Sequence, residues 1–164
     1  MGEAQTRTSR DDHRIKTILL VEDHDDSRTM LRLLLESDNY HVLEATTGSE
    51  ALEIARLRNP DLILMDIGLP ELDGLETIRR IRQVDGLQEA PIVVLSAYSG
   101  SAYYQSAIEA GGNYFVSKPI DFDKLKAVLI KIDNCATFQQ RHSEPDTGRA
   151  VKYIPHERKH RRSV

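Results

Sequence analysis

Residues Leu62 to Pro70 read LILMDIGLP, an apolar run that ends in one aspartate, Asp66, and then breaks at a glycine and a proline. The run does not alternate between apolar and polar residues, which predicts a strand covered on both faces, as in a parallel sheet. A carboxylate at the end of such a strand is costly to bury without a compensating partner. The chain must therefore supply groups that meet Asp66.

Short apolar runs and helical patterns alternate on both sides of this strand. The predicted strands are residues 16–22, 40–45, 61–66, 91–97 and 113–119. The predicted helices are residues 27–38, 47–58, 73–82, 101–110 and 121–132. Five strands that alternate with five helices predict an α/β fold with a doubly wound, five-stranded parallel sheet.

Several helix ends carry recognisable signals. Capping-box patterns, Thr47–Glu50 and Asp73–Glu76, open the second and third helices. The pair Asn59-Pro60 closes the second helix, and Gly111-Gly112 closes the fourth. Asp121 is placed to cap the fifth. These signals predict where the connecting loops lie.

The carboxyl ends of parallel strands meet at one edge of a doubly wound sheet, where such folds bind ligands. The residues at these ends are Glu22, Asp23, Asp66, Ser96 and Lys118. Three carboxylates brought together need a compensating charge, and Mg²⁺ with oxygen ligands provides one. Lys118 suits a phosphoryl oxygen, and Ser96 can donate a hydrogen bond to another. This set predicts phosphoryl transfer to a carboxylate.

In order and spacing, these motifs resemble the receiver domain of two-component response regulators. The resemblance covers about residues 15–135. It rests on the acid pair Glu22-Asp23, on MDIGLPELDGLE from Met65 to Glu76, on SA at 96–97 and on KP at 118–119. It implies a flavodoxin-like sheet with strand order 2-1-3-4-5 and a stand-alone, CheY-like regulator.

The resemblance also implies a role for each acid. Asp66 would accept a phosphoryl group from a phosphohistidine on a sensor histidine kinase or a histidine phosphotransfer protein, and form an acyl phosphate. Mg²⁺, or Mn²⁺ in its place, would be bound by Asp23, Asp66 and the backbone carbonyl of Gly68. Glu22 would act largely through a metal-bound water.

The remaining roles concern the response to phosphorylation. Lys118 would pair with Asp66 and then with the phosphoryl group, and Ser96 would move to hydrogen-bond that group. Phe115, the switch aromatic, would change a surface on the fourth helix, fifth strand and fifth helix, where a downstream protein target binds. The bond between Lys118 and Pro119 is expected to be cis. The protein would not be an enzyme in the ordinary sense, because it would catalyse only its own phosphorylation and slow dephosphorylation.

Three residues depart from the family pattern. Glu22 stands where aspartate is commoner, and Gly68 has no side chain to reach over a phosphoryl group. Phe115 lacks a hydroxyl group, so any signal that it carries must pass through packing. His24, beside the acid pair, is expected to be exposed rather than a metal ligand, because carboxylate sites prefer hard cations.

Two alternative functions remain open. A haloacid-dehalogenase-like phosphatase also uses a strand-end aspartate, Mg²⁺ and a lysine, but it needs a second acid where this chain has Gly68. A receiver-like binding module that signals without phosphate is the other alternative, although no key residue of the site is missing.

The length and the net charge of the chain limit the class of protein. The 164 residues carry a net charge of −4, and residues 136–164 contribute +4 of it, which leaves −8 for the remainder. We expect residues 1–14 to be a disordered arm and residues 136–164 a basic, disordered tail. The acidic body argues against nucleic acid as the partner of the whole chain. No apolar run approaches the ~20 residues of a membrane helix.

The sequence gives fewer indications of cellular location and of oligomeric state. The single cysteine, Cys135, cannot form an internal disulfide, which suits the cytoplasm. No effector domain follows the last predicted helix, so the output is expected to leave through protein contacts or the tail. A homodimer is left open.

Overall fold

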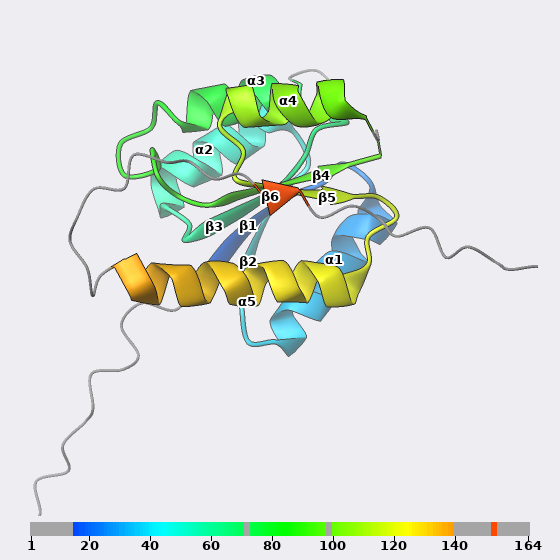
Figure 1. The fold of residues 1–164 in the computed structure, drawn as a ribbon, viewed down its shortest axis with the longest axis vertical. Helices are drawn as coiled ribbons and strands as arrows, with labels where there is room; N and C mark the ends of the chain where they lie inside the picture. The colour runs from blue at the N-terminus through cyan, green and yellow to red at the C-terminus, as the bar shows by residue number, and fades with distance from the viewer. Residues whose placement is uncertain (1–14, 71–72, 98–99, 140–151, 154–164) are drawn as a thin grey trace, which may run out of the picture.

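The computed structural model describes residues 15–70, 73–97, 100–139 and 152–153. A parallel sheet forms the middle layer, with helices on both faces (Figure 1). Its strands are β1 (Thr17–Val21), β2 (His41–Ala45), β3 (Leu62–Asp66), β4 (Ile92–Ser96), β5 (Tyr114–Ser117) and β6 (Lys152–Tyr153). The helices are α1 (Asp25–Ser37), α2 (Gly48–Arg58), α3 (Gly74–Ile81), α4 (Ser101–Ala110) and α5 (Phe122–Gln139).

The strands lie in the order β2-β1-β3-β4-β5-β6, and every neighbouring pair is parallel. The predicted fold, five parallel strands in the order 2-1-3-4-5 flanked by five helices, is confirmed. Strand β6 is an addition that the sequence did not predict, because two residues are too short to show any periodicity. It pairs with β5, which otherwise would be an open edge of the sheet.

Regular structure extends further toward the carboxyl end than the predicted helices and strands. Helix α5 continues to Gln139, past the predicted end of the fifth helix at Ile132, and β6 lies inside the segment predicted as a tail. The rest of that predicted tail, residues 140–151 and 154–164, lies outside the described residues. So does the predicted arm, residues 1–14.

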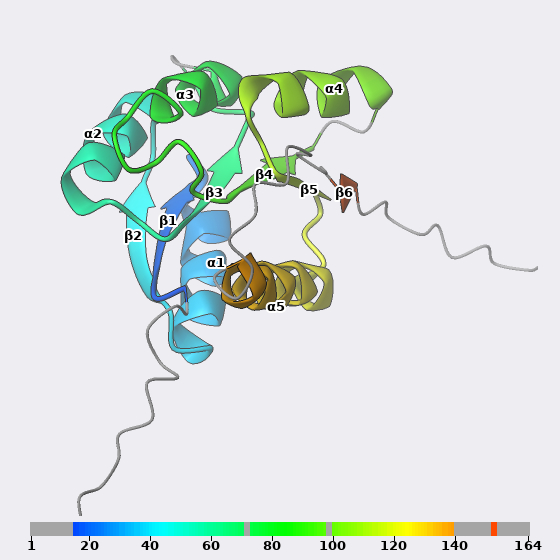
Figure 2. The same cartoon turned by 60° about the vertical axis from the view of Figure 1, so that its left-hand side comes forward.

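Two apolar cores pack against the two faces of the sheet. The side chains on one face of the sheet, including Ile63 and Met65, pack against α2, α3 and α4. The side chains on the opposite face, including Leu62 and Leu64, pack against α1 and α5. Figure 2 shows these two helical layers on opposite sides of the strands. Every residue of β3 is buried, as its unbroken apolar run predicted.

The helix ends follow the predicted signals. The Thr47 side chain accepts a hydrogen bond from the Glu50 backbone N–H at 3.2 Å, and Glu50 in turn accepts from the Thr46 N–H at 2.7 Å. Helix α2 ends before Asn59, which has a left-handed backbone with φ 44°. Helix α4 ends at Gly111, with φ 108°, a conformation that glycine adopts without strain.

Candidate functional site

The carboxyl ends of β1, β3 and β5 bring four of the predicted site residues together at one edge of the sheet. Carboxylate oxygens of Glu22, Asp23 and Asp66 all lie within 4.8 Å of one another. The Lys118 Nζ lies 2.6 Å from Glu22 Oε2 and 2.6 Å from Asp66 Oδ2. Residues that are far apart in sequence therefore form one acidic cluster with a single lysine in it.

The three acids differ in their surroundings. The Glu22 side chain is 1% exposed and the Asp66 side chain 8% exposed, so Lys118 neutralises carboxylates that have lost most of their water. Asp23 is exposed, and its carboxylate makes no hydrogen bond or ion pair with the described residues. Lys118 pairs with Glu22 and Asp66 but not with Asp23, so the cluster has more acidic than basic groups and the Asp23 carboxylate is available to a cation.

Lys118 remains charged in this environment. Burial acts to lower the pKa of Lys118, but the hydrogen bonds and charges of Asp66 and Glu22 outweigh burial and raise the pKa above its usual value. Its backbone N–H donates to the carbonyl of Ser96 at 2.7 Å, which ties the residue to the end of β4. The Lys118–Pro119 peptide is cis, as expected.

The turn after β3 holds the second oxygen of Asp66. The Gly68 N–H donates to Asp66 Oδ1 at 2.8 Å. Further along, Gly74 begins α3 directly against the end of β3. A Cβ atom at Gly74 would lie 2.4 Å from the Asp66 carbonyl oxygen, so only glycine permits this approach. Both carboxylate oxygens of Asp66 are thus oriented, one by Gly68 and one by Lys118.

A pocket of about 290 Å³ opens over the cluster. Its lining residues are Glu22, Asp23, His24, Ser27, Asp66, Gly68, Ala97 and Lys118. The donors that face one another are carboxylate oxygens, which are the ligands preferred by hard cations such as Mg²⁺ and Mn²⁺. The residues present therefore fit a divalent cation of this class.

Two predicted residues lie outside this pocket. Ser96 is fully buried at the end of β4, and Ala97 takes the place in the lining that the sequence suggested for Ser96. Phe115 is buried in the core, where its ring meets that of Tyr104 edge to face, with centroids 6.0 Å apart and planes at 74°. Neither residue lines the pocket.

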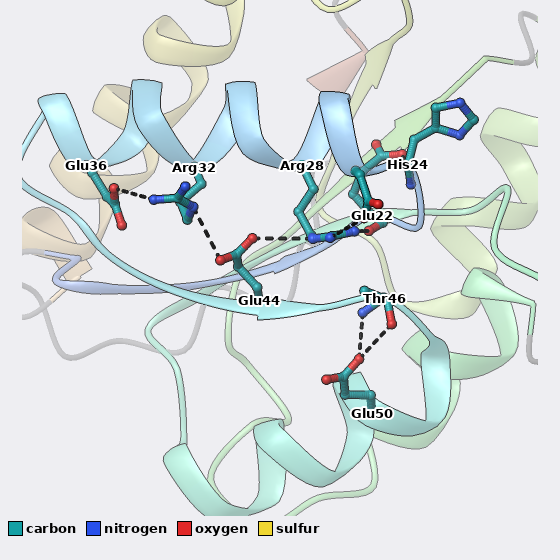
Figure 3. A network of polar contacts seen from close by, with 9 residues as sticks. Glu22, His24, Arg28, Arg32, Glu36, Glu44, Thr46 and Glu50 are labelled. Carbon is teal, nitrogen blue, oxygen red and sulfur yellow. Dashed lines mark hydrogen bonds and ion pairs between the residues drawn. The ribbon is translucent and has the colours of Figure 1, made fainter.

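His24 is exposed, as expected from the sequence, whereas Ser27 and Arg28 are residues near the site that sequence reasoning missed. His24 and Ser27 line the pocket, and Arg28 donates from Nη1 to the carbonyl oxygen of Glu22 at 3.0 Å (Figure 3). All three follow the acid pair, His24 as the residue before α1 and Ser27 and Arg28 in its first turn. Their position directly after the acid pair was the signal that could have found them. The first turn of a helix that follows a strand end lies at the same edge of the sheet as that strand end.

None of the helices in the described part of the chain is long and apolar enough to cross a membrane.

Comparison with known sequences gives the family. The family model of the response regulator receiver domain matches residues 18–130. The chain is 42% identical over 112 residues to the KDP operon transcriptional regulatory protein KdpE of Escherichia coli (strain K12), a match that covers 68% of this chain and 48% of that protein. It is 35% identical over 105 residues to the polar-differentiation response regulator DivK of Brucella anthropi, covering 64% of this chain and 85% of that protein. The match thus spans about half the length of KdpE and most of DivK.

Solved structures give the same result. The receiver domain of the sensor histidine kinase PA1611 from Pseudomonas aeruginosa, which has a magnesium ion coordinated in its active-site cleft, superposes with a TM-score of 0.68 at 32% identity. That superposition covers 73% of this chain and 98% of the other. The chemotaxis protein CheY4 of Vibrio cholerae superposes with a TM-score of 0.69 at 25% identity, covering 72% and 98%. With its doubly wound sheet and acidic cluster, this chain belongs to the family of response regulator receiver domains.

Proposed function

We propose that this protein is a response regulator in which Asp66 accepts a phosphoryl group from a phosphohistidine of a sensor histidine kinase or a histidine phosphotransfer protein. One observation carries the proposal. The Asp66 carboxylate lines an open pocket, 2.6 Å from Lys118 and beside the free carboxylate of Asp23. A nucleophilic oxygen, a cation for the incoming phosphoryl oxygens and a site for a metal ion are thus within reach of one another.

The chemistry is an in-line displacement at phosphorus. An oxygen of Asp66 forms a P–O bond while the P–N bond to the partner's histidine breaks, and the imidazole nitrogen keeps the electron pair of that bond. Lys118 supplies positive charge to the phosphoryl oxygens. Glu22, Asp23, Asp66 and the backbone carbonyl of Gly68 would hold Mg²⁺, or Mn²⁺, and the bound cation would offset the repulsion between carboxylate and phosphoryl group.

The signal would leave through a change in packing. A phosphoryl group adds roughly −1.5 to −2 charge at the edge of the sheet. We infer that Ser96 moves to hydrogen-bond this group and that Phe115 changes its packing in response. Phe115 lies on β5 and contacts Tyr104 on α4, so the affected face is that of α4, β5 and α5. A downstream protein target would bind there, and a second copy of the chain is the alternative occupant.

This proposal places the protein in the cytoplasm, where its phosphodonor is expected to be. The phosphorylated state would be lost by slow self-catalysed hydrolysis, which sets the duration of the signal. Gly68 lines the pocket with Asp66 and has no side chain to cover the carboxylate, where a Cβ would lie 3.4 Å from Asp66 Oδ1.

The test is phosphorylation of the full chain by acetyl phosphate with Mg²⁺, followed by intact mass. We expect one phosphoryl group on the wild-type protein, none on Asp66→Asn and none when EDTA removes the metal. The matched control is Asp61→Asn, because Asp61 precedes the same strand at its opposite end and, within the described part of the chain, its side chain accepts only from the Lys16 and Thr17 backbone N–H groups. Equal labelling of wild type and Asp66→Asn would disprove the assignment of the acceptor.

A further inference from the structure

We infer that Arg28 is a positioning residue for the cation site, and that it acts through the peptide group that joins Glu22 to Asp23. The inference rests on the proposed metal site. Arg28 touches none of the metal-ligand oxygens proposed above, so its contribution would be indirect.

Arg28 is an arginine with a defined set of partners at the start of α1. Its Nη1 donates to the Glu22 carbonyl oxygen at 3.0 Å, its Nη2 donates to Asp25, and its Nε lies 3.3 Å from Glu44 Oε2 on β2. Figure 3 shows the side chain running from α1 between the Glu22 main chain and Glu44. Only 15% of the side chain is exposed. The planar guanidinium is therefore fixed in orientation by groups on three sides.

The hydrogen bond from Arg28 to the Glu22 carbonyl affects the direction in which the Asp23 side chain points. The Glu22 carbonyl oxygen and the Asp23 Cα belong to one planar peptide unit. A hydrogen bond that fixes this plane also fixes the position from which the Asp23 side chain departs. The Asp23 carboxylate has no hydrogen bond or ion pair with the described residues, so its backbone is the main restraint on where it points.

The other side of Glu22 is already held without Arg28. The Glu22 N–H donates to the Ala45 carbonyl on β2 at 3.1 Å, and Glu22 Oε2 accepts from Lys118 at 2.6 Å. The His24 N–H donates to Glu22 Oε1 at 3.3 Å. The carbonyl that leads into Asp23 is the group that Arg28 restrains, which is why the loss of Arg28 should affect Asp23 more than Glu22.

Arg32 provides a matched control one turn further along α1. Its Nε lies 3.3 Å from Glu44 Oε1, and its Nη1 lies 3.0 Å from Glu36 Oε2. Arg28 and Arg32 thus share Glu44 and carry the same charge on the same helix. In the described part of the chain, Arg28 contacts the Glu22 carbonyl and Arg32 does not.

The sign of the effect separates positioning from simple electrostatics. A positive charge near a cation site opposes the binding of Mg²⁺. If Arg28 acted only through its charge, its removal would tighten Mg²⁺ binding. If it acts by aiming Asp23, its removal weakens Mg²⁺ binding, and outer-shell substitutions of this kind typically cost about tenfold or more in metal affinity.

The experiment measures Mg²⁺ affinity of the unphosphorylated full chain by isothermal titration calorimetry, with folding checked by circular dichroism. We expect Arg28→Ala to bind Mg²⁺ about tenfold more weakly than wild type, and Arg32→Ala to bind it as wild type does. Arg28→Lys keeps the positive charge but lacks the planar guanidinium with its several N–H donors, so it should also weaken Mg²⁺ binding. This variant serves as the test if Arg28→Ala does not fold. In acetyl phosphate labelling, Arg28→Ala should need more Mg²⁺ for half-maximal rate and approach the wild-type rate at saturation.

Three outcomes would overturn the inference. They are unchanged or tighter Mg²⁺ binding by the Arg28 variants, an equal loss in Arg32→Ala, or a labelling rate that stays low at saturating Mg²⁺. Asp23→Ala distinguishes this failure from failure of the proposed function. If wild type binds Mg²⁺ no better than Asp23→Ala, the proposed metal site itself is wrong and the inference about Arg28 falls with it.

Discussion

The ammonium nitrogen of Lys118 lies 2.6 Å from a carboxylate oxygen of Asp66, although the two residues are 52 positions apart in the chain. The same nitrogen lies 2.6 Å from Glu22, 96 positions away. One lysine side chain therefore ties the end of β5 to the ends of β1 and β3. It also neutralises part of a cluster of three carboxylates that otherwise would repel one another.

Replacement of Lys118 by methionine should destabilise the metal-free protein. Two buried carboxylates would lose their partner, and removal of one member of a buried pair typically costs about 3 kcal/mol or more. Urea unfolding in EDTA measures the loss. Lys126→Met is the control, because Lys126 forms a comparable contact of 2.7 Å with Asp38 but is largely exposed. Equal losses in the two variants would contradict the importance of the buried pairing.

The stabilisation by Lys118 should disappear at alkaline pH. Burial acts to lower the pKa of Lys118, but Asp66 and Glu22 raise it above its ordinary value of 10.5. A group with a raised pKa in the folded state contributes its stabilisation fully below the unfolded pKa, and that stabilisation is lost as pH rises through the folded pKa. The difference in free energy of unfolding between wild type and Lys118→Met should therefore be constant near neutral pH and shrink above about pH 10.5. A difference that shrinks near neutral pH would show that another group is responsible.

Gly74 should tolerate no side chain, whereas Gly100 should accept one. A Cβ atom at Gly74 would meet the Asp66 carbonyl oxygen at 2.4 Å and the Ile67 Cα at 2.6 Å. We expect Gly74→Ala to lose about 3 kcal/mol of stability and to label more slowly with acetyl phosphate, because the backbone that carries Asp66 must shift. Among the described residues other than its chain neighbours, none places a heavy atom within 4 Å of a Cβ at Gly100, so Gly100→Ala is the control. Equal stability of the two variants would show that the turn adapts.

Arg82 should be a structural arginine without a role in phosphoryl transfer. Its guanidinium donates to the carbonyls of Gly111, Leu87 and Ala90 and to the Asn113 side chain. Arg82→Ala would leave these partly buried acceptors unsatisfied, at an expected cost of about 3 kcal/mol. Arg82→Lys should recover little, since an ammonium cannot reproduce the fork. Chemical denaturation measures both, and a stable Arg82→Lys would contradict the geometric explanation.

The contact between Phe115 and Tyr104 tests the switch. A double-mutant cycle with Phe115→Leu and Tyr104→Leu should give a coupling of about 1 kcal/mol in the unphosphorylated protein. If Phe115 transmits the signal through packing, the coupling should fall when acetyl phosphate and Mg²⁺ are present. The same coupling in both states would assign Phe115 to the core alone.

Much of the fold was predictable because its signals are local. The apolar run of β3, the cap at Thr47 and the left-handed turn at Gly111 are each set by a few neighbouring residues. The meeting of Asp23, Asp66 and Lys118 was predictable for a different reason. A doubly wound topology, once inferred, places the ends of its parallel strands at a single edge whatever the loops contain.

Other features were decided only by the tertiary structure. Arg82 has a Gly111 partner 29 positions away, and Arg28 sits between Glu22 and Glu44. In the sequence both are ordinary helix arginines. Ser96 ends β4 but is fully buried, and Ala97 lines the pocket instead. A long polar side chain has many rotamers and several acceptors within reach. Only the packing of helices on the sheet selects which acceptor it meets, whereas strand and helix patterns are written in residues that are neighbours along the chain.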